Sequence, residues 1–338
     1  MKYILIAFLS AMLFGASTPI GKLLLDSLSS FQLAGLLYLG AAIGTLPFLV
    51  RKSNPLKISN LDGKNIFRLS GAISLGGVTG PVLLLLGLQI ASAASVAMWL
   101  NLELVFTAIL GFILFQDYLG LYGWIGIVGT LTASVFLSWN EEGIGLYALL
   151  FVGGATICWG LDNHLTALID GITPAQSTFW KGTVAGFTNL MISVLLESYG
   201  KEMDKILLAI IVGIFAYGFS ISLYILAAQN LGATRSQMIF ASAPFFGVII
   251  AVFLLGENIS TIQIVAALVL ILSLITLFRD QHDHFHTHVP LNHTHKHRHD
   301  DKHHNHSEEK GYHTHEHKHS PITHKHPHWP DLHHRHSH

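Results

Sequence analysis

Residues 206–228 read ILLAIIVGIFAYGFSISLYILAA, an apolar run without a charged side chain. An α-helix needs about 20 apolar residues to cross the hydrocarbon core of a bilayer. The run is long enough, so it predicts a transmembrane helix. Nine further segments of similar length and composition lie on either side of it. The ten predicted spans are 3–24, 31–50, 68–88, 94–115, 119–138, 146–167, 174–196, 206–228, 235–255 and 260–278.

The composition agrees with a membrane protein. Of the 338 residues, 51% are hydrophobic and only 12% are charged, whereas a soluble domain carries about 25% charged residues. Short polar turns separate the segments, so neighbouring helices are expected to run antiparallel. The predicted fold class is an all-α polytopic membrane protein with ten transmembrane helices in the lipid bilayer. A soluble all-α protein with a large core is the disfavoured alternative.

Several functional classes are excluded or made improbable by what the sequence lacks. The net charge of −1 excludes a strongly basic nucleic-acid-binding protein. The single cysteine, Cys158, excludes a disulfide scaffold and a cysteine-based metal site. The sequence holds no His-Glu-x-x-His pair, no Gly-x-Ser-x-Gly elbow and no phosphate-binding loop. We therefore expect no enzyme and no ATP-driven pump, so any transport would be gradient-driven or passive.

Lysine and arginine residues orient the predicted bundle, because short cytoplasmic loops carry most of them. With a cytoplasmic N-terminus, only Lys22, Lys201 and Lys205 lie on or near the opposite side. The cytoplasmic side then holds Lys2, Arg51, Lys52, Lys57, Lys64, Arg68, Arg235 and Arg279. The expected location is the cytoplasmic (inner) membrane, with both the N- and the C-terminus in the cytoplasm.

The two halves of the apolar region resemble each other in sequence. Gln89, Ala93, Phe106 and Asp117 match Gln229, Ala233, Phe246 and Glu257 at a constant offset of 140 residues. Each half, 1–139 and 143–279, holds five predicted spans. Because five is odd, the second half starts on the opposite side of the membrane from the first and is inverted relative to it. Inverted repeats are typical of secondary transporters. Chance similarity among apolar helices is the alternative, and the matched Gln and acidic positions argue against it.

Several short motifs carry a family resemblance. Phe14-Gly15 and Trp159-Gly160 stand early in each half, and the ninth span contains Pro244 and ends in Leu255-Gly256-Glu257. Together with residues 101–107, which read NLELVFT, they make the chain resemble the EamA-type permeases of the drug/metabolite transporter superfamily. The resemblance implies a small-molecule transporter that requires no cofactor. It also implies a cavity lined by helices 1, 3, 4, 6, 8 and 9.

The sequence departs from this family in three places. Tyr38 and Lys181 stand about where many members carry arginine, and Leu104 stands where the repeat partner Pro244 predicts proline.

Polar side chains inside the fourth span are candidates for a substrate pathway. Glu103 lies near the middle of this span, with Asn101 and Trp99 close by. A charged side chain at this depth costs about 2.5–3.5 kcal/mol on insertion scales, so it is expected to face the bundle interior or a cavity. Glu103 would bind a cation or carry a proton. The alternative is a structural role as a hydrogen-bonding partner.

The sixth span contains a second polar group, Asp162, Asn163 and His164. Successive helical residues lie about 100° apart, so the three cannot all face one cavity. Asp162 is expected to pair with Lys181 on the seventh span. His164, the only histidine of the apolar region, is either a hydrogen-bonded packing residue or part of a proton or metal path.

Prolines and glycines mark hinges and packing seams. Pro19, Pro81 and Pro244 lie within predicted spans, and a proline there frees a carbonyl, which is tolerated where the helix lines a cavity. We predict hinges at all three. Gly-x-x-x-Gly spacings begin at Gly40, Gly76 and Gly182 and allow close helix packing. They predict seams inside the bundle and leave a homodimer open.

The C-terminal tail has a metal-binding composition, because 22 of the 23 histidines lie at or after His282. With four prolines and few aliphatic residues, the tail is expected to be disordered. Imidazole suits nickel, cobalt and zinc, so we predict reversible binding of these ions. The predicted ligands are His282, His284, His286, His288, His293, His295, His297, His299, His313, His315, His317 and His319. The tail would deliver, sense or buffer metal, and a pH-responsive solubilising tail is the alternative.

Three functional hypotheses follow. The favoured one is a secondary transporter that exports a divalent metal cation, with the cytoplasmic tail collecting nickel, cobalt or zinc. The second is an EamA-type exporter of amino acids or other small metabolites, with an independent metal-buffering tail. The third is a membrane-anchored metal-binding or sensing protein that does not transport.

Overall fold

The computed structural model describes residues 2–50, 61–114, 119–139, 145–196 and 200–279, together with four short segments of the tail. Contacts divide the chain into a helical unit that extends through residue 280 and a tail unit formed by residues 281–328. The two units are described separately.

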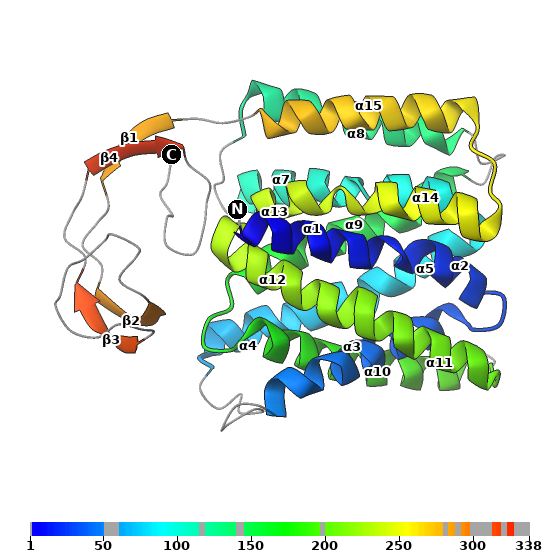
Figure 1. Ribbon diagram of the computed structural model, residues 1–338, viewed down its shortest axis with the longest axis horizontal. Coiled ribbons are helices and arrows are strands. Elements are labelled where there is room, and N and C mark those ends of the chain that lie inside the picture. Colours follow the sequence, from blue (N-terminus) through cyan, green and yellow to red (C-terminus); the bar gives the residue numbers. More distant parts are fainter. Residues whose placement is uncertain are drawn as a thin grey trace. The chain divides into compact units, whose positions relative to one another are not determined.

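The described helical unit consists of α-helices interrupted by two π-helical segments (Figure 1). Its first half contains α1 (Lys2–Gly15), α2 (Ser17–Leu24), α3 (Ser30–Val50), α4 (Gly63–Gly71), η1 (Ala72–Thr79), α5 (Gly80–Ile90), α6 (Ala93–Trp99), α7 (Leu102–Leu114) and α8 (Leu121–Ser138). Its second half contains α9 (Gly145–Ala167), α10 (Pro174–Leu196), α11 (Met203–Val212), η2 (Gly213–Phe219), α12 (Ser220–Leu231), α13 (Ala233–Phe240), α14 (Ala243–Leu255) and α15 (Thr261–Phe278).

Within the described residues, nine helical stretches are long and apolar enough to cross a membrane. They are Lys2–Leu24, Ser30–Leu49, Gly63–Ile90, Ala93–Leu114, Leu121–Ser138, Gly145–Ala167, Pro174–Leu196, Met203–Leu231 and Ala233–Leu255. The tenth predicted span forms α15, whose apolar part, Thr261–Thr276, is shorter than these. The protein is thus an all-helical multi-pass membrane protein in this unit, and the count of ten spans stays a prediction.

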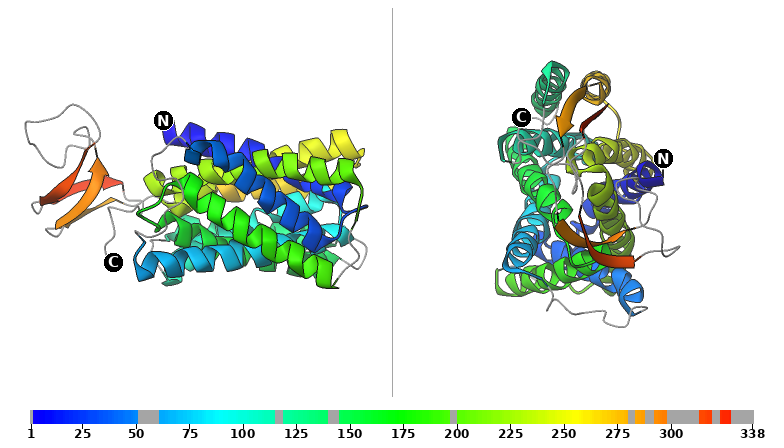
Figure 2. Two further views of the ribbon diagram at one scale, coloured as in Figure 1. Left: turned by 90° about the horizontal axis from the view of Figure 1, so that it is seen from below. Right: turned by 90° about the vertical axis from the view of Figure 1, so that its left-hand side faces the viewer.

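The helices pack in pairs drawn from opposite halves of the chain. α3 packs along α10, α1 along α12, and α5 along α9. Helices α8 and α15 lie side by side at one edge of the bundle (Figures 1 and 2). Because each half packs against the other, the interior of the bundle is shared between them.

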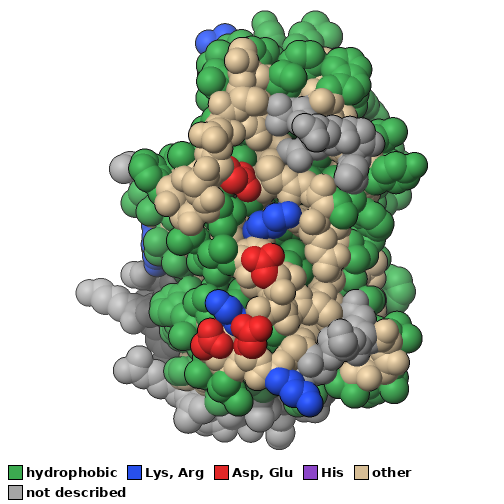
Figure 3. Space-filling model, turned by 90° about the vertical axis from the view of Figure 1, so that its right-hand side faces the viewer, with side chains coloured by type: hydrophobic (Ala, Val, Ile, Leu, Met, Phe, Trp, Pro, Cys, Tyr) green, Lys and Arg blue, Asp and Glu red, His purple; other side chains and the backbone are tan. Residues whose placement is uncertain are grey.

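The outer surface of the bundle suits lipid. Large hydrophobic side chains are widely exposed, including Phe253 at 86% and Leu195 at 74%. On the end of the bundle in Figure 3, acidic and basic side chains gather near the middle and hydrophobic ones surround them. This distribution fits a bundle whose sides meet hydrocarbon and whose end meets water.

Glycines form the seams between packed helices, as their spacing predicts. A Cβ atom at Gly40 would contact the Ile210 carbonyl and would come within 2.8 Å of Gly213 Cα. A Cβ atom at Gly182 would come within 2.6 Å of the Tyr38 carbonyl. These glycines are therefore used inside the bundle, and they lend no support to a homodimer.

Irregular helix geometry recurs at equivalent places in the two halves. The π-helical segments η1 and η2 begin 141 residues apart, since 213 − 72 = 141. Both helix pairs α6–α7 and α13–α14 are separated by a short break. The two halves thus share these two kinds of interruption, whereas α9 has no counterpart of the break between α1 and α2.

The three predicted hinge prolines lie next to helix irregularities. Pro19 is in the first turn of α2, directly after the break that follows α1. Pro81 is the second residue of α5, which continues directly from η1, and Pro244 is the second residue of α14, after the break that follows α13. Pro19 and Pro244 lie in first turns that follow breaks, where a proline is tolerated because its missing N–H has no helical partner there. The break before α7 forms without a proline.

Four short strands are described in the tail unit, and the disorder predicted for the whole tail stays a prediction. Strand β1 (Asp283–Thr287) pairs antiparallel with β4 (Thr323–Pro327), and β2 (Asn292–His297) pairs antiparallel with β3 (His313–Lys318). The alternation of histidine with other residues has the period of two that a strand requires. Of the predicted metal ligands, His282, His288, His299 and His319 lie outside the described residues.

Candidate substrate pocket

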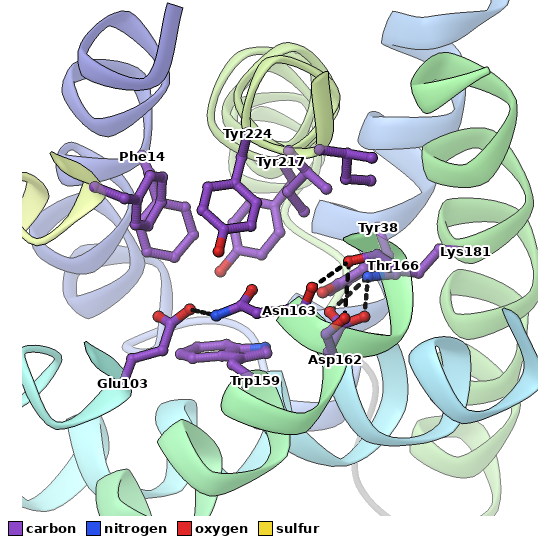
Figure 4. A pocket seen from close by; sticks show the side chains of 13 residues that line it. Phe14, Tyr38, Glu103, Trp159, Asp162, Asn163, Thr166, Lys181, Tyr217 and Tyr224 are labelled. Carbon is purple, nitrogen blue, oxygen red and sulfur yellow. Dashed lines mark hydrogen bonds and ion pairs between the residues drawn. The ribbon is translucent and has the colours of Figure 1, made fainter. Parts of the chain in front are cut away.

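A pocket lies inside the helical bundle, between elements from both halves (Figure 4). Its volume is about 50 Å³, enough for a few water molecules or part of a small solute, since one water needs roughly 10–15 Å³ measured in this way. It is lined by Phe14, Tyr38, Glu103, Trp159, Asp162, Asn163, Thr166, Lys181, Tyr217, Ile221, Tyr224, Ile225 and Phe240.

Aromatic rings form much of the pocket wall. The Phe14 ring contacts Trp159, Tyr217 and Phe240, with centroid distances of 6.3, 5.6 and 5.3 Å. Tyr224 packs edge-on against Phe240 at 5.2 Å. Tilted and edge-to-face ring contacts are favourable and restrict the ring orientations. The wall is therefore a connected and ordered apolar surface.

A buried ion pair occupies one side of the pocket. Lys181 Nζ lies 2.7 Å from Asp162 Oδ1 and 2.5 Å from Asp162 Oδ2. Lys181 on α10 is 1% exposed and Asp162 on α9 is 7% exposed. This confirms the predicted pair, which arises because α9 and α10 are consecutive antiparallel helices. Gly76 leaves room for it, since a Cβ atom there would collide with the Asp162 carboxylate.

An amide joins three helices on the other side of the pocket. Asn163 Nδ2, which carries two hydrogens, lies within hydrogen-bond distance of three acceptors, Glu103 Oε1 at 2.9 Å, Thr107 Oγ1 at 3.1 Å and Gln237 Oε1 at 3.3 Å. These partners come from α7 and α13, so both halves meet at Asn163. Glu103 is 6% exposed, and no lysine or arginine among the described residues forms an ion pair with it.

The π-helical segment η1 supplies an acceptor to the pocket wall. The Gly76 carbonyl accepts hydrogen bonds from the Tyr38 hydroxyl at 2.5 Å and from Trp159 Nε1 at 3.1 Å. The Tyr224 hydroxyl, by contrast, is buried and has no hydrogen-bond partner within the described structure. Figure 4 shows this hydroxyl pointing into the pocket. Its hydrogen-bonding capacity is thus available to a solute.

The structure brings together only part of the predicted pathway. Glu103, Asp162, Asn163 and Lys181 line the pocket, whereas three other predicted residues are not among the lining residues and bond elsewhere. Trp99 Nε1 donates to the Ser134 carbonyl, Asn101 Nδ2 donates to the Met98 carbonyl, and His164 Nε2 lies 2.9 Å from the Thr107 carbonyl. His164 faces away from Asp162, as the predicted rotation of about 100° per helical residue requires.

The aromatic members of the pocket were not identified as site residues from the sequence. Tyr217 and Tyr224 stand seven residues apart, a spacing that places two residues on one face of a helix. That spacing is a weak signal, because aromatic residues are also common on lipid-facing surfaces. Phe240 carries no comparable signal.

Polar contacts hold the turn between α5 and α6. Lys22 Nζ donates to the carbonyls of Leu88 and Ala91 at 2.6 and 2.9 Å, at the end of α5. The two carboxylate oxygens of Glu257 accept from the amides of Ala93 and Ala94 at 2.8 and 2.9 Å, at the start of α6. A carboxylate at a helix N-terminus satisfies amides that lack a helical partner.

A corresponding group joins α4 to the end of α9. Asn65 Nδ2 donates to Asp170, and Arg68 donates to the Leu168 carbonyl at 2.8 Å. Gln229 on α12 donates to the neighbouring Ile169 carbonyl at 3.1 Å. The segment that follows α9 is therefore held by two other helices.

The described bundle offers no metal centre. No group of three or more His, Cys, Asp or Glu side chains comes together among the residues that the structure describes. Asp162 is paired with Lys181, and His164 contacts a backbone carbonyl. The hypothesis of a metal path through Glu103, Asp162, Asn163 and His164 gains no support from this arrangement.

The fold and the pocket define a class of protein, the multi-pass helical membrane proteins with an internal cavity between their two halves. The sequence matches the EamA-like transporter family over residues 1–139 and 146–279. Because this match covers most of the chain, the protein belongs to the EamA-like transporter family.

Individual proteins support the same assignment. An uncharacterized transporter of Methanothermobacter thermautotrophicus is 25% identical over 287 residues, which cover 78% of this chain and 82% of that one. An uncharacterized transporter of Clostridium kluyveri is 23% identical over 282 residues, which cover 78% and 88%. One solved crystal structure superposes with a TM-score of 0.62 at 12% identity, over 82% of this chain and 96% of that one. This last likeness concerns the fold alone.

Proposed function

We propose that the protein is a secondary transporter of small organic molecules and that the pocket between the two halves is its solute site. The observation that carries this proposal is the lining of the pocket, where aromatic rings from α1, α9, η2, α12 and α13 enclose a few polar side chains. Solute sites are mostly apolar and contain a small number of oriented polar groups. The second of the three hypotheses from the sequence therefore becomes the preferred one.

Export of a bare metal ion fits this pocket poorly. A divalent cation needs several oxygen or nitrogen ligands, and the pocket offers one carboxylate that is free of a cationic partner, Glu103. The Lys181 ammonium stands beside the other carboxylate and would repel a metal ion. A protein that only anchors a metal-binding tail would not require an internal pocket of this kind.

An inverted pair of five-helix repeats, 1–139 and 143–279, is part of the proposal. The paired π-helical segments, the paired breaks before α7 and α14, and the sequence matches at an offset of 140 support it. Inverted repeats place the solute site between the halves, where the pocket lies. The Lys and Arg distribution supports a cytoplasmic membrane location with both termini in the cytoplasm.

Filling the pocket should strongly reduce transport. Ile221 lines the pocket, whereas Ile211 is 51% exposed on the apolar surface. With full-length protein in proteoliposomes, we expect Ile221→Trp to reduce solute flux by about tenfold or more, because an indole would occupy the space of the solute. Ile211→Trp should transport like the unmodified protein. The measurement is counterflow of labelled amino acids, amines and organic acids.

Two results would contradict the proposed function. One is equal flux through the Ile221→Trp and Ile211→Trp proteins. The other is flux that does not exceed that of empty liposomes for any of the solute classes tested.

We propose further that the tail is a separate metal-binding module for nickel, cobalt or zinc. The strand register supports this, because it pairs His284 with His326 and His286 with His324. In the second ladder His293, His295 and His297 pair with His317, His315 and His313. Histidines at facing positions on neighbouring strands are close enough to share an ion.

Metal binding by the full-length protein should depend on these paired histidines and on pH. We expect nickel binding at about pH 7.5 and its loss at about pH 5.5, because imidazole protonates near 6.5 and then has no lone pair for the metal. Replacing His284, His286, His324 and His326 by asparagine should lower the number of ions bound. Titration calorimetry measures both effects, with His164→Asn as the control. An unchanged stoichiometry in the fourfold variant would refute the role of the pairing.

A further inference from the structure

The ionisable side chains that line the pocket do not balance in formal charge. Its charged lining residues, among those described, are Glu103, Asp162 and Lys181, so the formal sum is −1. Asp162 and Lys181 satisfy each other at 2.5 and 2.7 Å. The excess charge therefore belongs to Glu103.

The described surroundings of Glu103 contain no lysine or arginine in direct contact with its carboxyl group. Its hydrogen bond comes from the neutral amide of Asn163, and it is 94% buried, since its exposed fraction is 6%. A buried charge without a partner is costly, and a cation of opposite sign offsets much of that cost. The pocket is thus better suited to a positively charged solute than to an anionic one.

Two further features of the pocket favour an organic cation over a bare ion. Aromatic faces attract ammonium groups within about 6 Å of the ring centroid, and Phe14, Tyr217 and Tyr224 stand around the same space (Figure 4). The buried Tyr224 hydroxyl lacks a partner in the described structure and can accept a hydrogen bond from an N–H group. The rings would also cover the apolar part of such a solute.

A solute with a carboxylate would meet an obstacle. Lys181 is the cation that would receive it, but both carboxylate oxygens of Asp162 already bond to the Lys181 ammonium. An amino acid zwitterion would have to displace Asp162 and would leave the excess negative charge in place. A singly charged amine needs no such rearrangement.

We propose that the pocket selects small organic amines that carry one positive charge and no carboxylate. The ammonium would lie beside Glu103 and the Tyr224 hydroxyl, with the apolar part of the amine against the aromatic rings. This inference rests on the proposed function, because it assumes that the pocket is the solute site.

Three probes that share a phenyl ring and differ in charge test the proposal. They are phenethylamine, phenylalanine and 3-phenylpropionate, and their binding to the detergent-solubilised full-length protein is measured by calorimetry. We expect phenethylamine to bind about tenfold or more tightly than either of the others. The Glu103→Gln variant should lose about tenfold or more of the amine affinity, because its side chain keeps the shape of Glu103 without the charge.

Two additional variants separate loss of recognition from loss of folding. Asp204→Asn removes a carboxylate on an exposed side chain and should bind phenethylamine like the unmodified protein. Tyr224→Phe deletes the unpartnered hydroxyl and should weaken amine binding without lowering the melting temperature. If Glu103→Gln does not fold, the Tyr224→Phe result together with the ranking of the three probes still decides the question.

Several outcomes would overturn the inference. They are amine binding that Glu103→Gln leaves unchanged, tighter binding of phenylalanine or 3-phenylpropionate, and an absence of phenethylamine binding. In a further case, the unmodified protein would transport phenylalanine, the Ile221→Trp variant would not, and the protein would not bind phenethylamine. In that case the proposed transport function would stand and only the preference for amines would fail.

Discussion

Replacing Lys181 by methionine should lower the free energy of unfolding by about 3–5 kcal/mol, because it leaves a buried carboxylate without its partner. Asp162 is 7% exposed, and Lys181 forms its ion pair. Methionine keeps most of the length of the lysine side chain, so the loss arises from charge more than from packing. Equilibrium unfolding in mixed detergent micelles measures the change.

Two comparisons isolate this effect. The double variant Lys181→Met with Asp162→Asn should recover much of the lost stability, since it removes the second charge of the buried pair. Lys205 and Asp204 lie 3.7 Å apart but are 38% and 74% exposed, so Lys205→Met should change stability by less than about 1 kcal/mol. An unaltered stability in Lys181→Met would show that the pair is solvated or broken in the folded protein.

Replacing Gly40 by alanine should destabilise the bundle by about 1–3 kcal/mol, the usual cost of overpacking. The new Cβ atom would contact the Ile210 carbonyl and would lie 2.8 Å from Gly213 Cα. Both neighbours are backbone atoms, so no side chain can rotate away and α3 must move from α11 and η2. Alanine gains about 0.5–1 kcal/mol over glycine within a helix, which is too little to offset the contact.

The matched control for Gly40→Ala lies on α9. A Cβ atom at Gly153 would meet nothing within 4 Å, so Gly153→Ala should be neutral or slightly stabilising in the same unfolding measurement. Equal stability of the two alanine variants would mean that α3 and η2 are not in close contact.

Much of the fold follows from simple properties of the sequence. Long apolar runs predict the spans because backbone polar groups in lipid must be satisfied within the chain, and a helix does this. The pairing of Asp162 with Lys181 was also predictable, because consecutive antiparallel helices bring the two positions to similar depth. The different environment of His164 followed from the rotation per helical residue.

The remainder of the site depends on packing between the halves. Trp99 and Asn101 share a span with Glu103, but they hydrogen-bond to the carbonyls of Ser134 and Met98 and do not line the pocket. The sequence alone does not show this. Tyr224 and Phe240 belong to the pocket because α12 and α13 pack against α1. No local pattern distinguishes them from aromatic residues that face lipid, and the pairing of strands in the tail is equally non-local.

The π-helical segments also bear on how substitutions along these helices should be interpreted. A π-helical turn contains more residues than an α-helical turn, because its hydrogen bonds reach one residue farther. The lipid-facing positions before and after η2 therefore do not follow one α-helical spacing, because η2 adds an offset between them. A scan of tryptophan substitutions through residues 203–231 should show a tolerated lipid-facing stripe whose phase jumps between Gly213 and Phe219.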